Sequence, residues 1–298
     1  MKYVLGNKRA IGVFLGPALL VYVAIIVVPV VWSLVYSFFS GSPAAGFTFV
    51  GLTNFGTLFT DPTIGQSLLF TIKYAVVILI GQIVLGYLMA LLYVFVLKKL
   101  STFIRTMVFF PVVLPTVAVA LLFSKMFAIA PENGPVNSLL NAVGLPSVDW
   151  FSTGSGAFVV IVVMELWRSV GFYAVLLYAG LVDIPEEIIE SARLDGASGV
   201  KLVRHIVFPM SLPIVIASLI FGLNADLKVF DTILALNNGG PGTETTPLNL
   251  YMYQTSFTYS NYGYGSTIAL LITVLCLAAT LLVFRSSRRN LAKDEEIS

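Results

Sequence analysis

Charged and amide side chains interrupt two long apolar stretches of this sequence. Glu165 and Arg168 stand three residues apart in the first stretch, so a helix would place both on one face. An ionised side chain at the centre of a lipid bilayer costs roughly 2.5 to 3.5 kcal/mol on insertion scales, so such residues need a structural or functional reason. The second stretch carries four polar residues, Asn224, Asp226, Lys228 and Asp231.

Two interpretations of these polar residues stay open. In the first, Glu165 pairs with Arg168 and Lys228 pairs with Asp231, and the pairs fix helix packing or reach toward the membrane surface. In the second, part of the set lines a path for a polar ligand, because protein groups must replace the water around such a ligand. A continuous helix would place Asn224, Lys228 and Asp231 on one face.

The sequence offers little for catalysis or metal binding. It contains a single histidine, His205, and a single cysteine, Cys276. An internal disulfide and a cysteine-based metal site are therefore excluded, as is most histidine-centred chemistry. A membrane-embedded enzyme would have only carboxylates to work with. We expect no catalytic residue and no metal ligand in this chain.

The composition indicates that lipid surrounds most of this chain. Of 298 residues, 58% are hydrophobic and only 11% are charged, and the mean hydropathy is +0.94. An ordinary soluble domain has about 25% charged residues. Seventeen Lys and Arg residues against 15 Asp and Glu residues leave a net charge of +2 without a basic stripe. These values exclude a disordered chain and a nucleic-acid-binding protein.

Six apolar windows are long enough to cross a bilayer core of about 30 Å. The sequence therefore predicts an all-α, polytopic membrane bundle of about six helices. The first window follows basic residues, as a signal peptide does, but it is nearly twice as long as a signal-peptide core, so we expect a retained anchor. The windows cover residues 11–39, 68–97, 103–127, 157–181, 210–236 and 264–284.

The loop charges predict the orientation of the bundle. Residues 40–67, 128–156 and 237–263, which are alternate connections, contain no Lys or Arg. The positive-inside rule then places both termini in the cytoplasm. The basic residues on the predicted cytoplasmic side are Lys2, Lys8, Arg9, Lys98, Lys99, Arg105, Arg193, Lys201, Arg204, Arg285, Arg288, Arg289 and Lys293.

The cytoplasmic connection 183–209 carries the most specific pattern. Asp183 and Glu186 have the spacing of a capping box, which predicts a short helix with Pro185 in its first turn. Gly196 would end that helix in the left-handed conformation. The apolar face of this helix would consist of Ile184, Ile188 and Ala192. A second short helix is expected from about residue 197 to 208, with an apolar face of Val200, Val203 and Val207.

This connection resembles the cytoplasmic signature of the membrane subunits of binding-protein-dependent ABC importers. The signature is Glu-Ala-Ala, three residues, Gly, nine residues, Ile, one residue, Leu-Pro. Two positions of this chain depart from it, Ser191 for Ala and Phe208 for Leu. The resemblance implies that a partner ATPase grips this loop, and the expected coupling residues are Glu190, Ser191, Ala192, Asp195, Gly196, Ile206 and Pro209.

Other motifs are similar to the carbohydrate-uptake branch of these importers, in particular to maltose-type first permease subunits and to glycerol-phosphate and oligosaccharide permeases. They are Trp167, Leu194-Asp195-Gly196-Ala197, Phe230-Asp231, Asn238-Gly239-Gly240-Pro241 and Tyr262-Gly263-Tyr264-Gly265. The resemblance implies the type I ABC importer transmembrane fold and transport by alternating access. It also implies a bacterial or archaeal cell membrane as the location.

The resemblance also implies an organisation and a set of partners. We expect one transmembrane domain over residues 1–298, with an anchor helix and outer loop in 1–66, a core permease region in 67–285 and a cytoplasmic tail in 286–298. The partners would be a second permease subunit, two cytoplasmic ATPases and an extracytoplasmic solute-binding protein. No Gly-x-x-x-x-Gly-Lys-Ser/Thr motif occurs, so ATP and Mg²⁺ are expected on the ATPases and no cofactor on this chain.

The expected substrate is a carbohydrate, with a di- or oligosaccharide preferred. A glycerol phosphate or another polyol is the alternative, and an ion-coupled secondary transporter is a further one, although the repeated halves typical of that class are not seen. Aromatic faces would cover the C–H surfaces of a sugar, although Trp, Tyr and Phe in membrane helices more often contact lipid or other helices. The candidate path residues are Glu165, Trp167, Arg168, Tyr173, Tyr178, Asn224, Asp226, Lys228 and Asp231.

Overall fold

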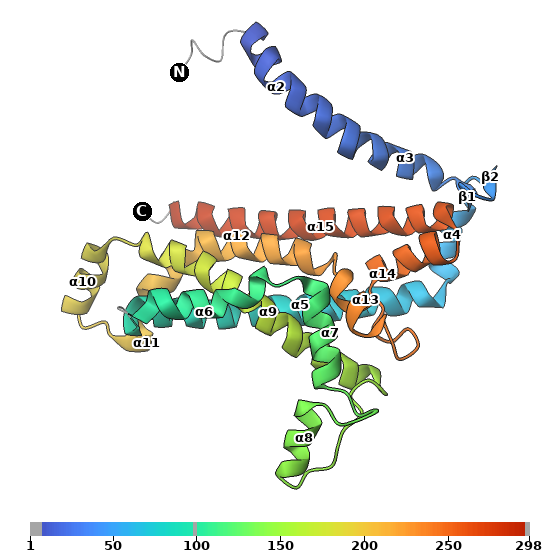
Figure 1. The fold of residues 1–298 in the computed structure, drawn as a ribbon. Coiled ribbons are helices and arrows are strands. Elements are labelled where there is room, and N and C mark those ends of the chain that lie inside the picture. The colour runs from blue at the N-terminus through green and yellow to red at the C-terminus, as the bar shows by residue number, and fades with distance from the viewer. Residues whose placement is uncertain (1–7, 98–99, 296–298) are drawn as a thin grey trace. The chain divides into compact units, whose positions relative to one another are not determined.

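The computed structural model describes residues 8–97 and 100–295 (Figure 1). Within this part, five helices are long and apolar enough to cross a membrane, and a bent helix pair makes up to six. This confirms the predicted all-α, multi-pass membrane bundle. The five helical spans are Ile11–Tyr36, Pro62–Val96, Gly154–Val182, Gly199–Asp226 and Tyr262–Arg285.

Some predicted basic residues fall outside this description. Lys2, Lys98 and Lys99 lie outside the described residues, and so do the side chains of Lys8, Arg9, Arg288, Arg289 and Lys293. The cytoplasmic location of both termini stays a prediction, as do the domain boundaries at residues 66 and 285.

The chain divides into two compact units, which we describe separately. The first comprises residues 1–64 and 251–273, and the second comprises residues 65–250 and 274–298. The helix α15 (Tyr262–Glu295) and the short helix α14 (Leu248–Tyr253) run from one unit into the other.

The first unit holds the N-terminal span and a small hairpin. Its elements are α2 (Lys8–Tyr22), the π-helix η1 (Val23–Val27), α3 (Val28–Tyr36), β1 (Phe39–Ser42), β2 (Gly46–Phe49), α4 (Thr53–Thr60), the π-helix η5 (Gln254–Thr258) and the start of α15. The strands are antiparallel, with Phe39 opposite Phe49. This hairpin was not predicted from the sequence, because four-residue strands are too short to show a period-2 pattern.

Asp61 joins two distant segments of the first unit. The hydroxyls of Tyr251 and Tyr264 donate to its Oδ2 at 2.6 and 2.7 Å, and the Thr63 amide donates to its Oδ1 at 2.8 Å. Burial alone would raise the pKa of Asp61, but these hydrogen bonds outweigh burial and hold the pKa below its usual value. Burial and the bond to Asp61 raise the pKa of Tyr251 to about 12.

The second unit is the helical core. Its elements are α5 (Pro62–Leu91), η2 (Leu92–Val96), α6 (Ser101–Val113), α7 (Thr116–Met126), α8 (Pro135–Ala142), α9 (Gly154–Val182), α10 (Glu186–Leu194), α11 (Gly199–Leu202), η4 (Val203–Val207), α12 (Phe208–Asp226) and α13 (Asp231–Asn237). The helix α9 packs against α6, α7, α12 and α13.

Small residues and apolar side chains explain the packing of α9. Ile161, Met164 and Leu177 of this helix are fully buried. Gly171 has no side chain where α9 meets α6, and a Cβ at this position would collide with the backbone carbonyl of Val108. The two helix backbones can therefore approach closely at this point, as is common where small residues line a membrane helix interface.

Proline accounts for the bent third span. Helix α6 ends before Leu114 and Pro115, and α7 starts at Thr116 with its axis turned by 93°. The residue before a proline disfavours the helical conformation, and Leu114 has the extended angles φ −69° and ψ 140°. The predicted single window 103–127 is therefore a broken pair of helices rather than one straight crossing.

Candidate functional site: a polar cavity and an exposed helical hairpin

A cavity of about 290 Å³ lies in the second unit, between α5, α9, α12 and α13. Its volume is near the lower end of the range for small-molecule sites. Polar and aromatic side chains dominate its walls. The lining residues are Tyr74, Gln82, Val112, Glu165, Arg168, Ser169, Phe172, Tyr173, Phe221, Ala225, Asp226, Lys228, Val229, Asp231 and Thr232.

One wall of the cavity holds a bidentate ion pair. The Nη2 of Arg168 lies 2.6 Å from Oε1 of Glu165, and its Nε donates to Oε2 at 3.4 Å. Glu165 is only 4% exposed, so its charge depends on this partner. The predicted pairing of these two residues, three apart on one helix, is present in the structure.

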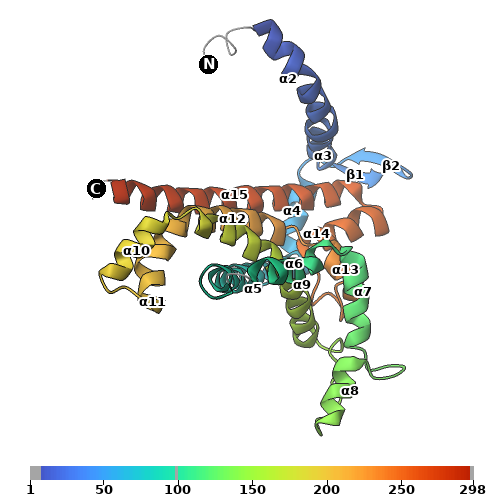
Figure 2. The same cartoon turned by 60° about the vertical axis from the view of Figure 1, so that its left-hand side comes forward.

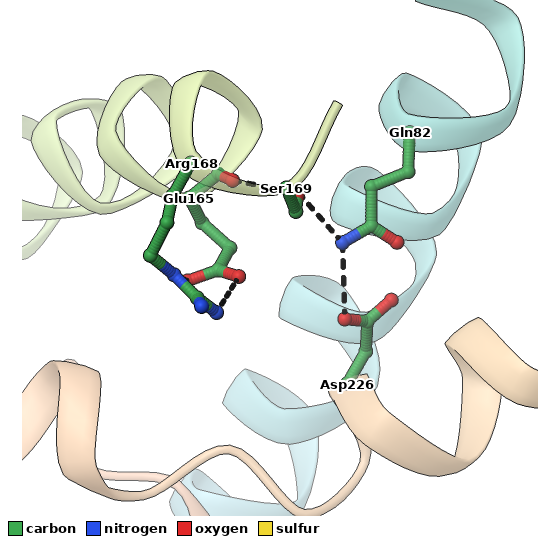
Figure 3. Close-up of polar contacts among 5 residues, drawn as sticks. All are labelled: Gln82, Glu165, Arg168, Ser169 and Asp226. Atoms are coloured by element: carbon green, nitrogen blue, oxygen red, sulfur yellow. Dashed lines mark hydrogen bonds and ion pairs between the residues drawn. The ribbon is translucent and has the colours of Figure 1, made fainter. Parts of the chain in front are cut away.

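A hydrogen-bonded chain crosses from α9 to α12 through an amide of α5. Gln82 Nε2 donates to Ser169 Oγ at 3.0 Å and to Asp226 Oδ1 at 3.5 Å, and Ser169 Oγ donates to the Glu165 carbonyl oxygen at 2.7 Å. Figure 3 shows Glu165 facing Arg168 on one side of Ser169, with Gln82 and Asp226 on the other side. Three helices thus meet at one buried polar network.

Two acceptors of this network lack a donor. Within the described part of the chain, Gln82 Oε1 and Asp226 Oδ2 are buried and have no hydrogen-bond partner. Gln82 is 2% exposed and Asp226 is 4% exposed. A buried polar atom without a partner costs free energy, so it needs an explanation such as a bound ligand, water or proton.

The structure brings together most of the predicted path residues and leaves three outside. Trp167 is 41% exposed and packs on Phe123, with 5.6 Å between ring centroids. Asn224 donates to Ile220 O and Thr280 Oγ1, so it joins α12 to α15 within the second unit. Tyr178 lies under the guanidinium of Arg105, 4.1 Å from the ring centroid. The residues on the cavity wall are Glu165, Arg168, Tyr173, Asp226, Lys228 and Asp231.

The predicted fifth helix was wrong beyond Asp226. Helix α12 ends there, and residues 227–230 connect it to the separate helix α13. Asn224, Lys228 and Asp231 therefore do not share a helix face. Lys228 and Asp231 are both exposed, and the structure has no ion pair between these two residues. No proline or glycine marks this break, and Leu227, Val229 and Phe230 keep the window 210–236 apolar enough to be taken for one helix.

Sequence reasoning missed four polar residues of this site. Tyr74, Gln82, Ser169 and Thr232 are uncharged, whereas the predicted path residues in the spans were mainly charged side chains. One signal could have pointed to Gln82. It is the lone amide in the predicted membrane window 68–97, which is otherwise almost free of strongly polar side chains.

The second candidate site is a hairpin of short helices at the far end of α9. Figures 1 and 2 both show α10 and α11 beyond the ends of α9 and α12. In α10 the side chains of Glu186, Glu187, Glu190 and Arg193 are exposed, and so is Leu194, at 90%. The outer face of α10 is therefore mainly charged, with Leu194 exposed among the charged side chains.

The predicted capping box of this hairpin was wrong. Helix α9 continues to Val182, and the Asp183 amide still donates to the Ala179 carbonyl, so Asp183 ends α9 instead of starting α10. Pro185 is the N-cap residue of α10, with φ −56° and ψ 133°, and no side chain caps the helix there. Asp183 and Glu186 have the spacing of a capping box, but α9 extends to Val182, so Asp183 is the C-cap residue of α9.

The predicted apolar faces were partly wrong. Ile184 and Ala192 are buried as expected, but Ile188 is 38% exposed and Ile189 is buried in its place. In the second helix Leu202 and Val207 are buried, whereas Val200 is 81% exposed. That helix also does not end at Pro209, since η4 leads directly into α12 and Gly199–Asp226 forms one continuous helical span.

The turn between α10 and α11 has the predicted glycine geometry. Gly196 has φ +84°, and no atom lies within 4 Å of where its Cβ would be. The Gly196 amide donates to Arg193 O, and the Ala197 amide donates to Ala192 O. Of the other expected coupling residues, Glu190, Ser191, Asp195 and Pro209 are exposed and Ile206 is half-buried. Glu190 and Ser191 thus lie exposed on α10, and Asp195 lies exposed at its C-cap, directly before the turn at Gly196.

The described residues contain no group of three His, Cys, Asp or Glu side chains that could hold a metal ion. Long apolar helices, a buried polar cavity between them and an exposed charged hairpin define a multi-pass membrane protein with the architecture of a solute permease. Residues 82–292 match the family model described as binding-protein-dependent transport system inner membrane component. The chain belongs to that family.

Individual relatives cover nearly the whole chain. The sulfoquinovosyl glycerol transport system permease protein SmoG of Agrobacterium fabrum is 31% identical over 286 residues, which are 95% of this chain and 92% of that protein. The multiple sugar-binding transport system permease protein MsmF of Streptococcus mutans is also 31% identical over 286 residues, covering 95% and 97%.

A solved structure confirms the fold. A chain of a bacterial ABC transporter involved in the import of the acidic polysaccharide alginate has a TM-score of 0.84 at 22% sequence identity. The alignment covers 97% of this chain and 98% of that one. The likeness shows that this chain has the fold of an ABC importer membrane subunit, as the signature residues predicted.

Proposed function

We propose that this chain is a permease subunit of an ATP-driven importer that carries a di- or oligosaccharide into the cytoplasm. The observation that carries the proposal is the exposed turn at Gly196. It places Glu190, Ser191 and Asp195 on a protruding hairpin within the region that matches the family. Such a hairpin suits the docking of a separate motor, because it can transmit a rigid-body displacement to α9 and α12.

The partners follow from the proposal. Two ATPase subunits would bind ATP and Mg²⁺ and grip this hairpin and its counterpart on a second permease subunit. A solute-binding protein would deliver the sugar, and a solved relative of this fold is described in complex with its pentasaccharide-bound periplasmic protein. We place the hairpin and both termini in the cytoplasm, as the distribution of basic residues predicts.

The polar cavity is the proposed sugar path. Its walls combine aromatic rings of Tyr173 and Phe172 with the network of Gln82, Ser169 and Asp226. Apolar rings suit the C–H faces of a sugar, and donors and acceptors suit its hydroxyls. The names of SmoG and MsmF point to carbohydrate cargo for those proteins, which supports the same substrate class here.

Reconstitution tests the function. The chain is purified with its ATPases and second permease, placed in liposomes, and assayed for ATP hydrolysis and sugar uptake with the matching binding protein. We expect uptake that requires ATP and the binding protein. Uptake driven by an ion gradient without ATP would refute the proposal and favour a secondary transporter.

A pair of variants on one helix tests the path. Asp226→Ala removes a residue of the cavity wall, whereas Asn224→Ala, two residues earlier on α12, removes a side chain outside it. We expect sugar-stimulated ATP hydrolysis to fall in the first variant and to stay near normal in the second, in complexes of equal subunit content. Equal activity of both variants would show that the cavity is not part of the sugar path.

A further inference from the structure

We infer that the polar cavity selects an uncharged, polyhydroxylated ligand and discriminates against sugars that carry a phosphate, sulfonate or carboxylate group. The inference rests on the proposed function and specifies the substrate class of the same site. It also separates the two cargo types that the sequence left open, a neutral saccharide and a polyol phosphate.

The first argument is the charge of the cavity wall. It contains two cationic side chains, Arg168 and Lys228, against three carboxylates, Glu165, Asp226 and Asp231. The wall therefore has no excess of positive charge. With a proton on Asp226, two cationic side chains would face two carboxylates, which still leaves no excess. Anion sites in proteins are built from uncompensated Arg or Lys side chains or from helix N-termini, because a buried anion needs a nearby positive charge.

The second argument is that the inner cation is already occupied. Arg168 uses both Nε and Nη2 on the carboxylate of Glu165, at 3.4 and 2.6 Å. An acidic ligand would have to displace a buried carboxylate from a bidentate pair and leave it without a partner. Lys228, the other cation, is exposed to solvent and shares the cavity wall with Asp231.

The third argument is the direction of the missing hydrogen bonds. Two buried atoms of the cavity wall lack partners within the described residues, Gln82 Oε1 and Asp226 Oδ2, and both are acceptors when Asp226 is ionised. Figure 3 shows that these two side chains face each other on the side of Ser169 away from Arg168. Sugar hydroxyls supply donors to such atoms, whereas ionised phosphate, sulfonate and carboxylate groups supply only further acceptors.

Matched sugar pairs test this inference. The purified complex of this chain with its second permease and ATPases, without the binding protein, is titrated with trehalose and trehalose 6-phosphate and with galactobiose and digalacturonate. Glycerol 3-phosphate is a further anion. We expect the neutral member of at least one pair to bind. Its acidic partner should bind at least about tenfold more weakly, since the carboxylate of Asp226 repels a negative charge beside it.

Charge variants then test the cause. Glu165→Gln frees Arg168, and Asp226→Asn removes the second buried carboxylate, so each should improve the binding of the acidic member relative to the neutral one by about tenfold. The control is Glu132→Gln, which removes an exposed carboxylate from the connection between α7 and α8. We expect the ratio of the two dissociation constants to stay unchanged in this control.

The outcomes separate the inference from the proposed function. Tighter binding of the acidic members, binding of neither member of any pair, or an unchanged ratio in Asp226→Asn would overturn the inference. The basal ATP hydrolysis of the same sample reports on the proposed function. If the ATPases fail to co-purify with this chain, the proposed function itself fails. Normal ATP hydrolysis with tight binding of an acidic sugar would reject the inference alone.

Discussion

Arg168 binds the carboxylate of Glu165 one helical turn earlier on α9, with 2.6 Å between Nη2 and Oε1. The pair explains how an apolar membrane helix can carry two opposite charges. The neighbouring Ser169 links the same turn to Gln82 of α5 and onward to Asp226 of α12. The ion pair and the polar groups of α5 and α12 that face the cavity are therefore linked through one turn of α9.

Removal of the arginine should be more damaging than removal of the whole pair. Arg168→Gln leaves Glu165 almost fully buried with no cation, which typically costs about 3 to 5 kcal/mol. Glu165→Gln together with Arg168→Gln leaves two neutral side chains and should cost less. Thermal unfolding of the purified complexes measures the difference. A double variant less stable than Arg168→Gln would show that the pair does not act as described.

Gly171→Ala should loosen the contact of α9 with α6. The added methyl group would collide with the backbone carbonyl of Val108, which cannot rotate away as a side chain can. Overpacking of this kind typically costs about 1 to 3 kcal/mol. The matched control is Gly16→Ala in α2, where no atom lies within 4 Å of the added methyl. We expect a lower midpoint of thermal unfolding only for Gly171→Ala.

Substitutions at Gly196 should reduce coupling in proportion to their backbone strain. A left-handed residue other than glycine costs about 1 to 2 kcal/mol, and asparagine tolerates that conformation better than other residues. We expect sugar-stimulated ATP hydrolysis to decrease from wild type to Gly196→Asn, then to Gly196→Ala and Gly196→Val. Nothing lies within 4 Å of the position, so side-chain clashes are not the cause. Full activity in Gly196→Val would contradict the left-handed turn.

Asp61 should contribute a pH-dependent part of the stability. Hydrogen bonds from Tyr251 and Tyr264 outweigh burial and hold its folded-state pKa below the ordinary value of 3.8. The stabilisation is therefore complete above the unfolded-state pKa and is lost as the pH falls through the lower folded-state pKa.

The variant Asp61→Asn checks this sign. We expect a lower midpoint of thermal unfolding than wild type by the same amount at pH 7 and pH 5, and a smaller difference only below about pH 4. A difference that already disappears between pH 7 and pH 5 would mean that the folded-state pKa of Asp61 is raised.

The sequence predicted the spans well and the polar geometry less well. Hydropathy alone located the crossings, because a bilayer demands long apolar helices. The bend at Pro115 also had a visible cause. The break between Asp226 and Asp231 had no such cause, because no proline or glycine lies there and Leu227, Val229 and Phe230 keep the window apolar despite Lys228. The side chain of Lys228 therefore lies in a connection and not on a helix face.

Long-range contacts account for the remaining differences. Gln82 contacts Ser169, which is 87 positions away in the sequence, and Asp226, which is 144 positions away. No local sequence pattern encodes such contacts. In the hairpin, Ile189 and Leu202 are buried in place of Ile188 and Val200, because the rotation of each short helix is set by its packing and not by its own period. Gly196 was predictable, since a glycine after a helix commonly adopts the left-handed conformation.

The central claim is that the α10 hairpin docks on an ATPase. A photoreactive crosslinker is placed at Leu194, which is 90% exposed on α10. The control position is Val143, which is 66% exposed next to α8. Both positions are tested in a variant with Cys276→Ala. We predict a crosslinked product with the ATPase subunit from residue 194 and none from residue 143. A complex in which residue 194 reacts with no ATPase, or residue 143 does, would contradict the account.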